Sequence, residues 1–267
     1  MKKYISFFRI RVINGLQYRA AAYAGIVTQL AWGGLAILMY RAFYLSGTGS
    51  LPMSMQELST YIWLQQAFLT LFMPWLFDNE LFDSITGGNI AYELCRPADM
   101  YYMWFIKNAA MRVARMLLRF APVLIIAAFL PVPYNMTLPV SIVSGVAFIF
   151  SLIIGFLVIV AFLMLIYISA FYTVSAQGTR MLAMTVIDFL TGGVIPLPFF
   201  PEGFRTVAYL LPFASMQNTP YLIYTGYISG INIIYSILLQ LFWLAVLLAA
   251  GKAWMQKAIS RVVVQGG

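Results

Sequence analysis

Long apolar runs constrain this chain more than any other sequence feature. Residues 140–171 contain no charged side chain over 32 positions. A helix rises about 1.5 Å per residue, so this run alone measures about 48 Å, more than the roughly 30 Å of a bilayer's hydrocarbon core. With 63% hydrophobic and 9% charged residues, the chain differs strongly from soluble domains. The sequence therefore predicts an all-α integral membrane protein.

We expect one domain over residues 1–267, with six membrane-spanning helices. Residues 1–19 are basic and amphipathic, which favours a helix on the membrane surface that precedes the first span. The run at 140–171 fits either one tilted helix or two spans joined by an unmarked turn, and Pro74 predicts a kink in the second span. The expected spans are residues 20–44, 58–77, 110–130, 140–171, 181–195 and 231–250.

The positions of Lys and Arg predict the orientation in the membrane. With six crossings, 14 of the 16 basic residues fall on one side, and Arg41 and Arg205 fall on the other. The positive-inside rule places the basic side, and hence both termini, in the cytoplasm. Two crossings at 140–171 would move the basic tail outside, so one helix is favoured there. The cations form no extended basic face, which argues against a nucleic-acid partner.

Missing residue types exclude several kinds of chemistry. The chain has no histidine and one cysteine, Cys95, which rules out an internal disulfide, metal clusters built on His or Cys, and His-based triads. It also lacks the G-x-x-x-x-G-K-[ST] nucleotide-binding motif. We therefore expect no catalytic residue, metal or cofactor in this chain.

The segment at 78–99, DNELFDSITGGNIAYELCRPAD, holds five of the eight acidic residues. Asp78 is suited to cap a helix N-terminus, where Glu80 and Asp83 also favour the positive end of the helix dipole. The glycine pair 87–88 predicts the helix end. The charge count places this short amphipathic helix, its glycine turn and a return segment in the cytoplasm. The residues alone allow either a docking element or an ordinary solvated loop.

Residues 196–230 carry five of the twelve prolines, so one continuous helix is excluded. The intervening residues are apolar and aromatic. Irregular backbone cannot face lipid, so we expect short external helices packed against the spans.

Asp188 is the one carboxylate inside a predicted span. Inserting a charge at mid-span costs about 2.5 to 3.5 kcal/mol, and such groups are often functional. It is a candidate pathway residue that contacts substrate or protons. The alternative is a structural carboxyl group hydrogen-bonded to Thr185, Thr191 or a neighbouring helix.

Two segments resemble a known family. SITGGNIAYELCRPAD resembles the cytoplasmic connection of type-2 ATP-binding-cassette (ABC) export permeases, in the branch written I-x-x-G-x-I-A-x-x-L-x-R-P. GGVIPLPFFPEGFRTVAYLLPFASMQNTPYLIYTG is similar to that branch's pattern of Gly, Pro-Leu-x-Phe-Phe-Pro, Leu-Pro-Phe, Pro and Gly. The segments occur in the family's order, and the resemblance covers essentially the whole chain.

The resemblance implies a permease subunit that exports an amphiphilic or hydrophobic substrate from the cell by alternating access. It implies partnership with cytoplasmic ABC ATPase subunits, which bind the ATP and Mg, and with a second permease, identical or related. The location implied is the cell membrane, and we expect a bacterial cytoplasmic membrane, with lipid around the spans. This subunit is not an enzyme by itself.

The resemblance also assigns residues to roles. The coupling helix that docks on the ATPase takes Asp78, Glu80, Leu81, Phe82, Asp83 and Ile85, and the following turn and return strand take Gly88, Asn89, Ile90, Leu94, Arg96 and Pro97. The external gate segment contains Pro196, Phe199, Phe200, Pro201, Pro212 and Phe213.

The main alternative is a proton-coupled secondary transporter that uses Asp188. A single intramembrane carboxylate provides little for a proton relay, and no inverted repeat is visible in the sequence. A membrane-embedded enzyme lacks candidate groups for acid–base chemistry. A purely structural membrane protein would show no ATP-dependent flux.

Overall fold

The computed structural model describes residues 2–47, 51–173 and 176–261. Within these ranges the chain forms α-helices and one short 3-10 helix, and no β-strand. The all-α prediction is confirmed for this part of the chain. The predicted domain also covers residues 1, 48–50, 174–175 and 262–267, which lie outside the described residues.

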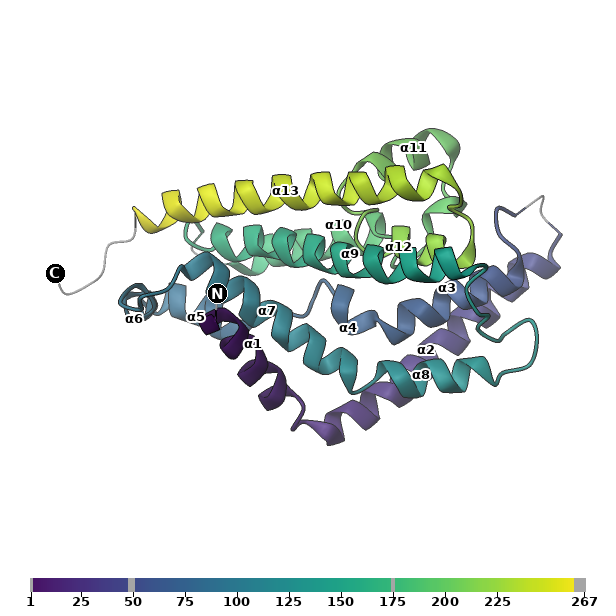
Figure 1. Ribbon diagram of the computed structural model, residues 1–267, viewed down its shortest axis with the longest axis horizontal. Coiled ribbons are helices and arrows are strands. Elements are labelled where there is room, and N and C mark those ends of the chain that lie inside the picture. The colour runs from purple at the N-terminus through teal and green to yellow at the C-terminus, as the bar shows by residue number, and fades with distance from the viewer. Residues whose placement is uncertain (1, 48–50, 174–175, 262–267) are drawn as a thin grey trace.

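Helices α9 (Ile142–Ser169) and α13 (Ile231–Ile259) lie along the long axis of the molecule and pack against each other, whereas α2 (Arg19–Leu45) runs obliquely to them (Figure 1). The elements are α1 (Lys2–Gly15), α2 (Arg19–Leu45), α3 (Met55–Ala67), α4 (Leu69–Phe72), α5 (Asn79–Thr86), α6 (Ile90–Leu94), α7 (Met100–Leu117), α8 (Phe120–Ala128), α9 (Ile142–Ser169), α10 (Ala176–Leu190), η1 (Leu197–Phe199), α11 (Glu202–Leu210), α12 (Asn218–Thr225) and α13 (Ile231–Ile259).

Three helices, α2, α9 and α13, are long and apolar enough to cross a membrane. They coincide with the predicted spans 20–44, 140–171 and 231–250. Helix α9 is unbroken over 28 residues, which confirms the single-helix prediction for 140–171. The apolar helices are those of a multi-pass membrane protein, and α9 is one continuous helix long enough to cross the bilayer.

The other three predicted spans fall on interrupted or shorter helices. The span at 58–77 is divided into α3 and α4 at Phe68, and helical structure ends at Phe72. The predicted kink at Pro74 is therefore wrong: the helix has already ended, because proline disfavours helical backbone in the residue before it. The count of six spans stays a prediction.

Similar interruptions occur in the third and fifth predicted spans. The span at 110–130 is divided into α7 and α8 around Leu118 and Arg119, and α7 begins well before it, at Met100. The span at 181–195 corresponds to α10, which ends at Leu190, before the left-handed Gly192 (φ 76°). Breaks inside apolar segments leave backbone carbonyl groups without helical partners.

The two motif segments lie at opposite ends of the molecule. Helices α5 and α6 lie near the N-terminal part of α1 and the C-terminal part of α13, whereas α11 and α12 lie toward the other end (Figure 1). The predicted topology requires this separation. The assignment of one end to the cytoplasm stays a prediction from charge.

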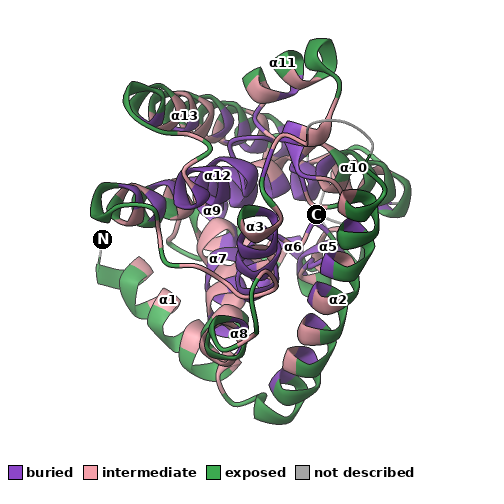
Figure 2. Cartoon of the chain, turned by 90° about the vertical axis from the view of Figure 1, so that its right-hand side faces the viewer, coloured by how far each residue is buried: buried purple, intermediate pink, exposed green. Residues whose placement is uncertain are grey.

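Helix α9 lies at the centre of the fold. Buried residues gather on α9, α12 and α3, whereas α1, α2 and α13 carry much of the exposed surface (Figure 2). Val158, Ile159 and Leu163 on α9 are fully buried. The lateral faces of α2 and α13 are apolar and exposed, as expected for surfaces that contact lipid or a second subunit.

Candidate functional site

The acidic segment forms a helix whose ends are specified by its own residues. The Asp78 side chain caps α5 and accepts a hydrogen bond from the Glu80 N–H at 3.0 Å. The helix ends at Gly87, and Gly88 has a left-handed backbone (φ 76°). The predicted N-cap and glycine stop are confirmed.

The return segment differs from the predicted strand. Ile90–Leu94 forms the short helix α6, followed by bends through Arg96 and Pro97. The described part of the chain contains no β-strand with which this segment could form a sheet. One helical turn satisfies backbone groups locally, as in the 3.2 Å bond from the Cys95 N–H to the Ala91 carbonyl. The strand prediction for this segment is wrong.

The predicted docking residues divide between two faces. Leu81, Phe82 and Ile90 are buried and point into the protein, and Ile85 is half-buried. The exposed members are Glu80, Asp83, Gly88, Asn89, Leu94, Arg96 and Pro97. Tyr92, which the resemblance did not assign, is 74% exposed. A partner protein can therefore reach an acidic and aromatic surface here.

Aromatic contacts hold the inner face of α5. The Phe82 ring lies 4.8 Å from the Tyr167 ring of α9, centroid to centroid. The Arg180 guanidinium, from α10, lies 4.7 Å from the Phe82 ring and 4.8 Å from the Phe77 ring. A cation over an aromatic face is attracted by the ring quadrupole. Helix α5 is therefore attached to both α9 and α10.

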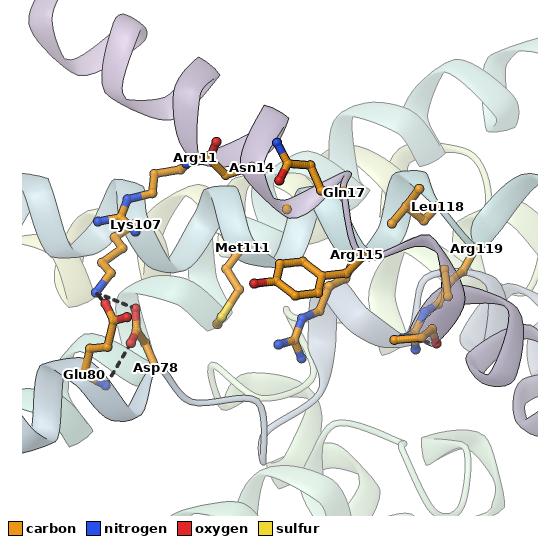
Figure 3. A pocket seen from close by; sticks show the side chains of 14 residues that line it. Arg11, Asn14, Gln17, Asp78, Glu80, Lys107, Met111, Arg115, Leu118 and Arg119 are labelled. Carbon is orange, nitrogen blue, oxygen red and sulfur yellow. Dashed lines mark hydrogen bonds and ion pairs between the residues drawn. The ribbon is translucent and has the colours of Figure 1, made fainter.

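A third helix holds α5 through charge. Lys107 of α7 donates to Asp78 at 2.9 Å and to Glu80 at 2.7 Å (Figure 3). The hydrogen bond from Lys107 and its positive charge lower the pKa of Glu80. The side chains of Asp78 and Lys107 are only 11% and 12% exposed, so Asp78 faces α7 and not a partner.

Arg112 of α7 is fully buried and satisfies the broken end of the second predicted span. Its guanidinium donates to the carbonyl oxygens of Leu71 at 3.0 Å, Met73 at 2.8 Å and Leu76 at 2.6 Å. These carbonyls lack helical partners because α4 ends at Phe72. A buried cation is tolerated when its donors are hydrogen-bonded in this way.

The hydrogen bonds continue from Arg112 to α5. Arg112 Nε donates to Asn108 Oδ1 at 2.8 Å, and Asn108 Nδ2 donates to the Tyr167 hydroxyl at 3.0 Å. The backbone N–H of Asp78 donates to the same hydroxyl at 2.7 Å. A buried polar network thus links the second predicted span, α7, α9 and the N-cap of α5.

Sequence reasoning assigned no role at this site to Lys107, Arg112, Tyr167 or Arg180; the three cations entered only the charge count. A signal existed for Arg112, since it lies among small and apolar residues in the run AAMRVARM, where a cation needs partners. The carbonyl groups that Arg112 satisfies lie 36 to 41 positions away, so the sequence could not identify them.

A cavity of about 740 Å³ lies beside this ion-pair cluster, between α1 and α7. Lys107, Asp78 and Glu80 line one part of it, and Arg115 and Arg119 line another (Figure 3). Helix α1 covers this cavity and packs along α7. Helix α5, the ion pairs and α1 therefore form one connected region.

Asp188 lines a second cavity, of about 630 Å³, between α2, α3–α4 and α10; we call it the α2–α10 cavity. The two hydrogen bonds expected in the structural alternative do not form. Thr185 donates to the Met181 carbonyl at 3.1 Å, and Thr191 accepts from Gln217 at 2.9 Å. The carboxylate borders the open space of this cavity.

The external segment forms the short helices expected for residues 196–230, namely η1, α11 and α12. Pro196 lines the α2–α10 cavity, and the Phe199 ring lies 5.6 Å from the ring of Tyr40 on α2. The predicted gate residues are Pro196 and Pro212, which are buried, Phe199, Phe200 and Phe213, which are half-buried, and Pro201, which is exposed. The segment therefore lies against one end of the cavity.

A sequence model of the family described as ABC-2 family transporter protein matches residues 22–266. No curated protein matches the chain. The matched residues include α5, all the helices that line the α2–α10 cavity apart from the first turn of α2, and the external segment.

Proposed function

This chain belongs to the ABC-2 family of transporter proteins, and we propose that it is the permease subunit of an ATP-driven exporter that moves an amphiphilic substrate out of the cell. The motor is a separate cytoplasmic ABC ATPase, which binds the ATP and Mg. A second permease, identical or related, completes the transport path.

The observation that carries this proposal is the attachment of α5 to three different helices. Lys107 links it to α7, Tyr167 to α9 and Arg180 to α10. The exposed surface of this segment, with Asp83 on α5 and Tyr92 on α6, is free to bind a partner. A force applied to the exposed face is therefore transmitted to several helices of the transport path.

The transport cycle follows from this attachment. ATP binding closes the two ATPase subunits, and their grooves displace the α5 helices. The attached helices α7, α9 and α10 then shift between two packed arrangements, one open to the cytoplasm and one open to the outside. Because α10 and the external segment line the α2–α10 cavity, the same shift changes access to it.

Co-purification with the ATPase tests the docking surface. Asp83 and Tyr92 are exposed, so the double variant Asp83→Lys and Tyr92→Ala removes partner contacts without disturbing the core. Glu202→Lys, an equally exposed charge reversal on α11, is the matched control. We expect the double variant to lose the ATPase and ATP-dependent transport, and the control to keep both. Full binding and transport by the double variant would refute docking at α5.

Transport measured in membrane vesicles that contain this chain and its ATPase separates an ATP-driven exporter from a proton-coupled transporter. We expect flux to require ATP and to persist when an ionophore collapses the proton gradient. Flux that follows the gradient without ATP would assign the energy source to protons and Asp188.

A further inference from the structure

The α2–α10 cavity has the size and lining of an organic-ligand site. Its volume of about 630 Å³ falls in the range of pockets that hold drug-sized molecules. Trp32 and Tyr40 from α2 and Phe72 and Trp75 from the second predicted span supply aromatic surface. This lining fits a ligand with a large apolar body.

Two amides in the cavity wall lack partners. Gln29 is 3% exposed, and among the described residues neither its oxygen nor its nitrogen has a hydrogen-bond partner. Gln66 is 9% exposed, and its oxygen Oε1 is also buried without a partner. Buried polar groups in folded proteins are nearly always hydrogen-bonded, so an unpaired buried amide needs an explanation. Gln29 and Gln66 both line this cavity, so a ligand bound there is the candidate partner.

Asp188 is the one charged side chain among the described residues that line this cavity. No hydrogen bond or ion pair to its carboxylate occurs in the described part of the chain. A carboxylate beside aromatic rings attracts a cation, through charge-assisted hydrogen bonds and through the ring faces. It repels an anion, and a neutral ligand leaves it unpaired.

We propose that the α2–α10 cavity is the cargo site and that the cargo is an amphiphilic organic amine, with its ammonium group on Asp188 and its apolar body against the aromatic wall. A primary ammonium donates hydrogen bonds and the carboxylate of Asp188 is an uncommitted acceptor, while Gln29 and Gln66 add uncommitted amide oxygens to the lining of the same cavity. The inference rests on the proposed role as an export permease and adds the class of substrate.

The test is direct binding to the purified full chain in lipid nanodiscs, without ATPase. The probe is dansylcadaverine, a fluorescent amphiphilic primary amine, and its neutral N-acetyl derivative is the matched ligand. We expect the amine to bind more tightly. Asp188→Asn should weaken amine binding about ten- to a hundredfold, the range for a lost hydrogen bond to a charged group, and leave binding of the neutral derivative unchanged.

Further variants separate charge recognition from folding. Asp188→Glu keeps the charge and should retain the preference for the amine. Gln29→Leu should weaken amine binding, whereas Asp83→Asn on α5 and Gln256→Leu on α13, both exposed and outside this cavity, should not. Unchanged binding of the neutral derivative shows that each variant is folded.

Two results overturn the proposal: equal affinity of the wild type for the amine and its neutral derivative, or unchanged amine affinity in Asp188→Asn. If either occurs while the ATPase still co-purifies, the chain remains an export permease and only the substrate class is wrong. If the amine binds as expected but no ATPase associates, the cargo site stands and the ATP-driven function fails.

Discussion

The hydroxyl group of Tyr167, near the end of the central helix α9, accepts a hydrogen bond from the backbone N–H of Asp78 at 2.7 Å. Asp78 is the residue that caps the docking helix α5. The same hydroxyl accepts from Asn108 at 3.0 Å, so one oxygen joins α5, α7 and α9. The position of α5, the proposed docking helix, is thereby fixed to the central helix α9.

Removing this hydroxyl should weaken that connection. In Tyr167→Phe the ring contacts with Phe82 remain, but the donors of Asp78 and Asn108 lose their acceptor. A buried unsatisfied donor costs about 1 to 3 kcal/mol, so we expect a lower melting temperature and less transport per ATP hydrolysed. Tyr172→Phe is the control, since Tyr172 is 41% exposed. Equal effects of the two substitutions would show that the hydroxyl of Tyr167 has no special role.

Arg112 should be essential to the fold. Arg112→Leu leaves the carbonyls of Leu71, Met73 and Leu76 without donors in a buried region, which we expect to cost roughly 3 to 5 kcal/mol. Arg115 lies three residues after Arg112 on α7 but is exposed, so Arg115→Leu should change stability little. Thermal unfolding in detergent measures both. Comparable melting temperatures for the two variants would contradict the role of Arg112.

The Lys107–Glu80 pair predicts a pH dependence. Lys107 lowers the pKa of Glu80 below its ordinary value of 4.5, so the ionised form is favoured in the folded protein. Its stabilising contribution is fully present above pH 4.5 and disappears as the pH falls through the lowered pKa. The difference in melting temperature between wild type and Glu80→Gln should therefore be constant near neutral pH and vanish in acid. A difference that grows on acidification would contradict this prediction.

The predicted orientation can be tested with the single cysteine. Cys95 is exposed beside α6, so a maleimide that cannot cross lipid should label it in inverted vesicles and not in intact cells. In a Cys95→Ser background, Thr206→Cys on the exposed face of α11 should show the opposite pattern. Labelling of Cys95 from outside intact cells would reverse the orientation and remove the docking helix from the ATPase.

Local sequence signals predicted much of the docking segment. The Asp78 side chain caps α5 by accepting from the N–H two residues later, and the helix ends after eight residues, at the glycine pair 87–88. Ser54 and Glu57 likewise form a reciprocal cap at the start of α3, with bonds of 3.2 Å and 2.7 Å. Such contacts join neighbours in the chain, so residue type and spacing are sufficient to predict them.

The sequence by itself determined the helical, membrane-embedded class and the ends of α5, because apolar run length and capping depend on adjacent residues. The distribution of Lys and Arg favoured a single helix at α9, where run length alone allowed one span or two. Only the tertiary structure decided which face of α5 is buried, which carbonyls Arg112 satisfies and that Asp188 borders a cavity. Those contacts join residues 36 to 89 positions apart, as for Leu76 with Arg112 and Asp78 with Tyr167. Their formation depends on how separate helices pack, which no local pattern specifies.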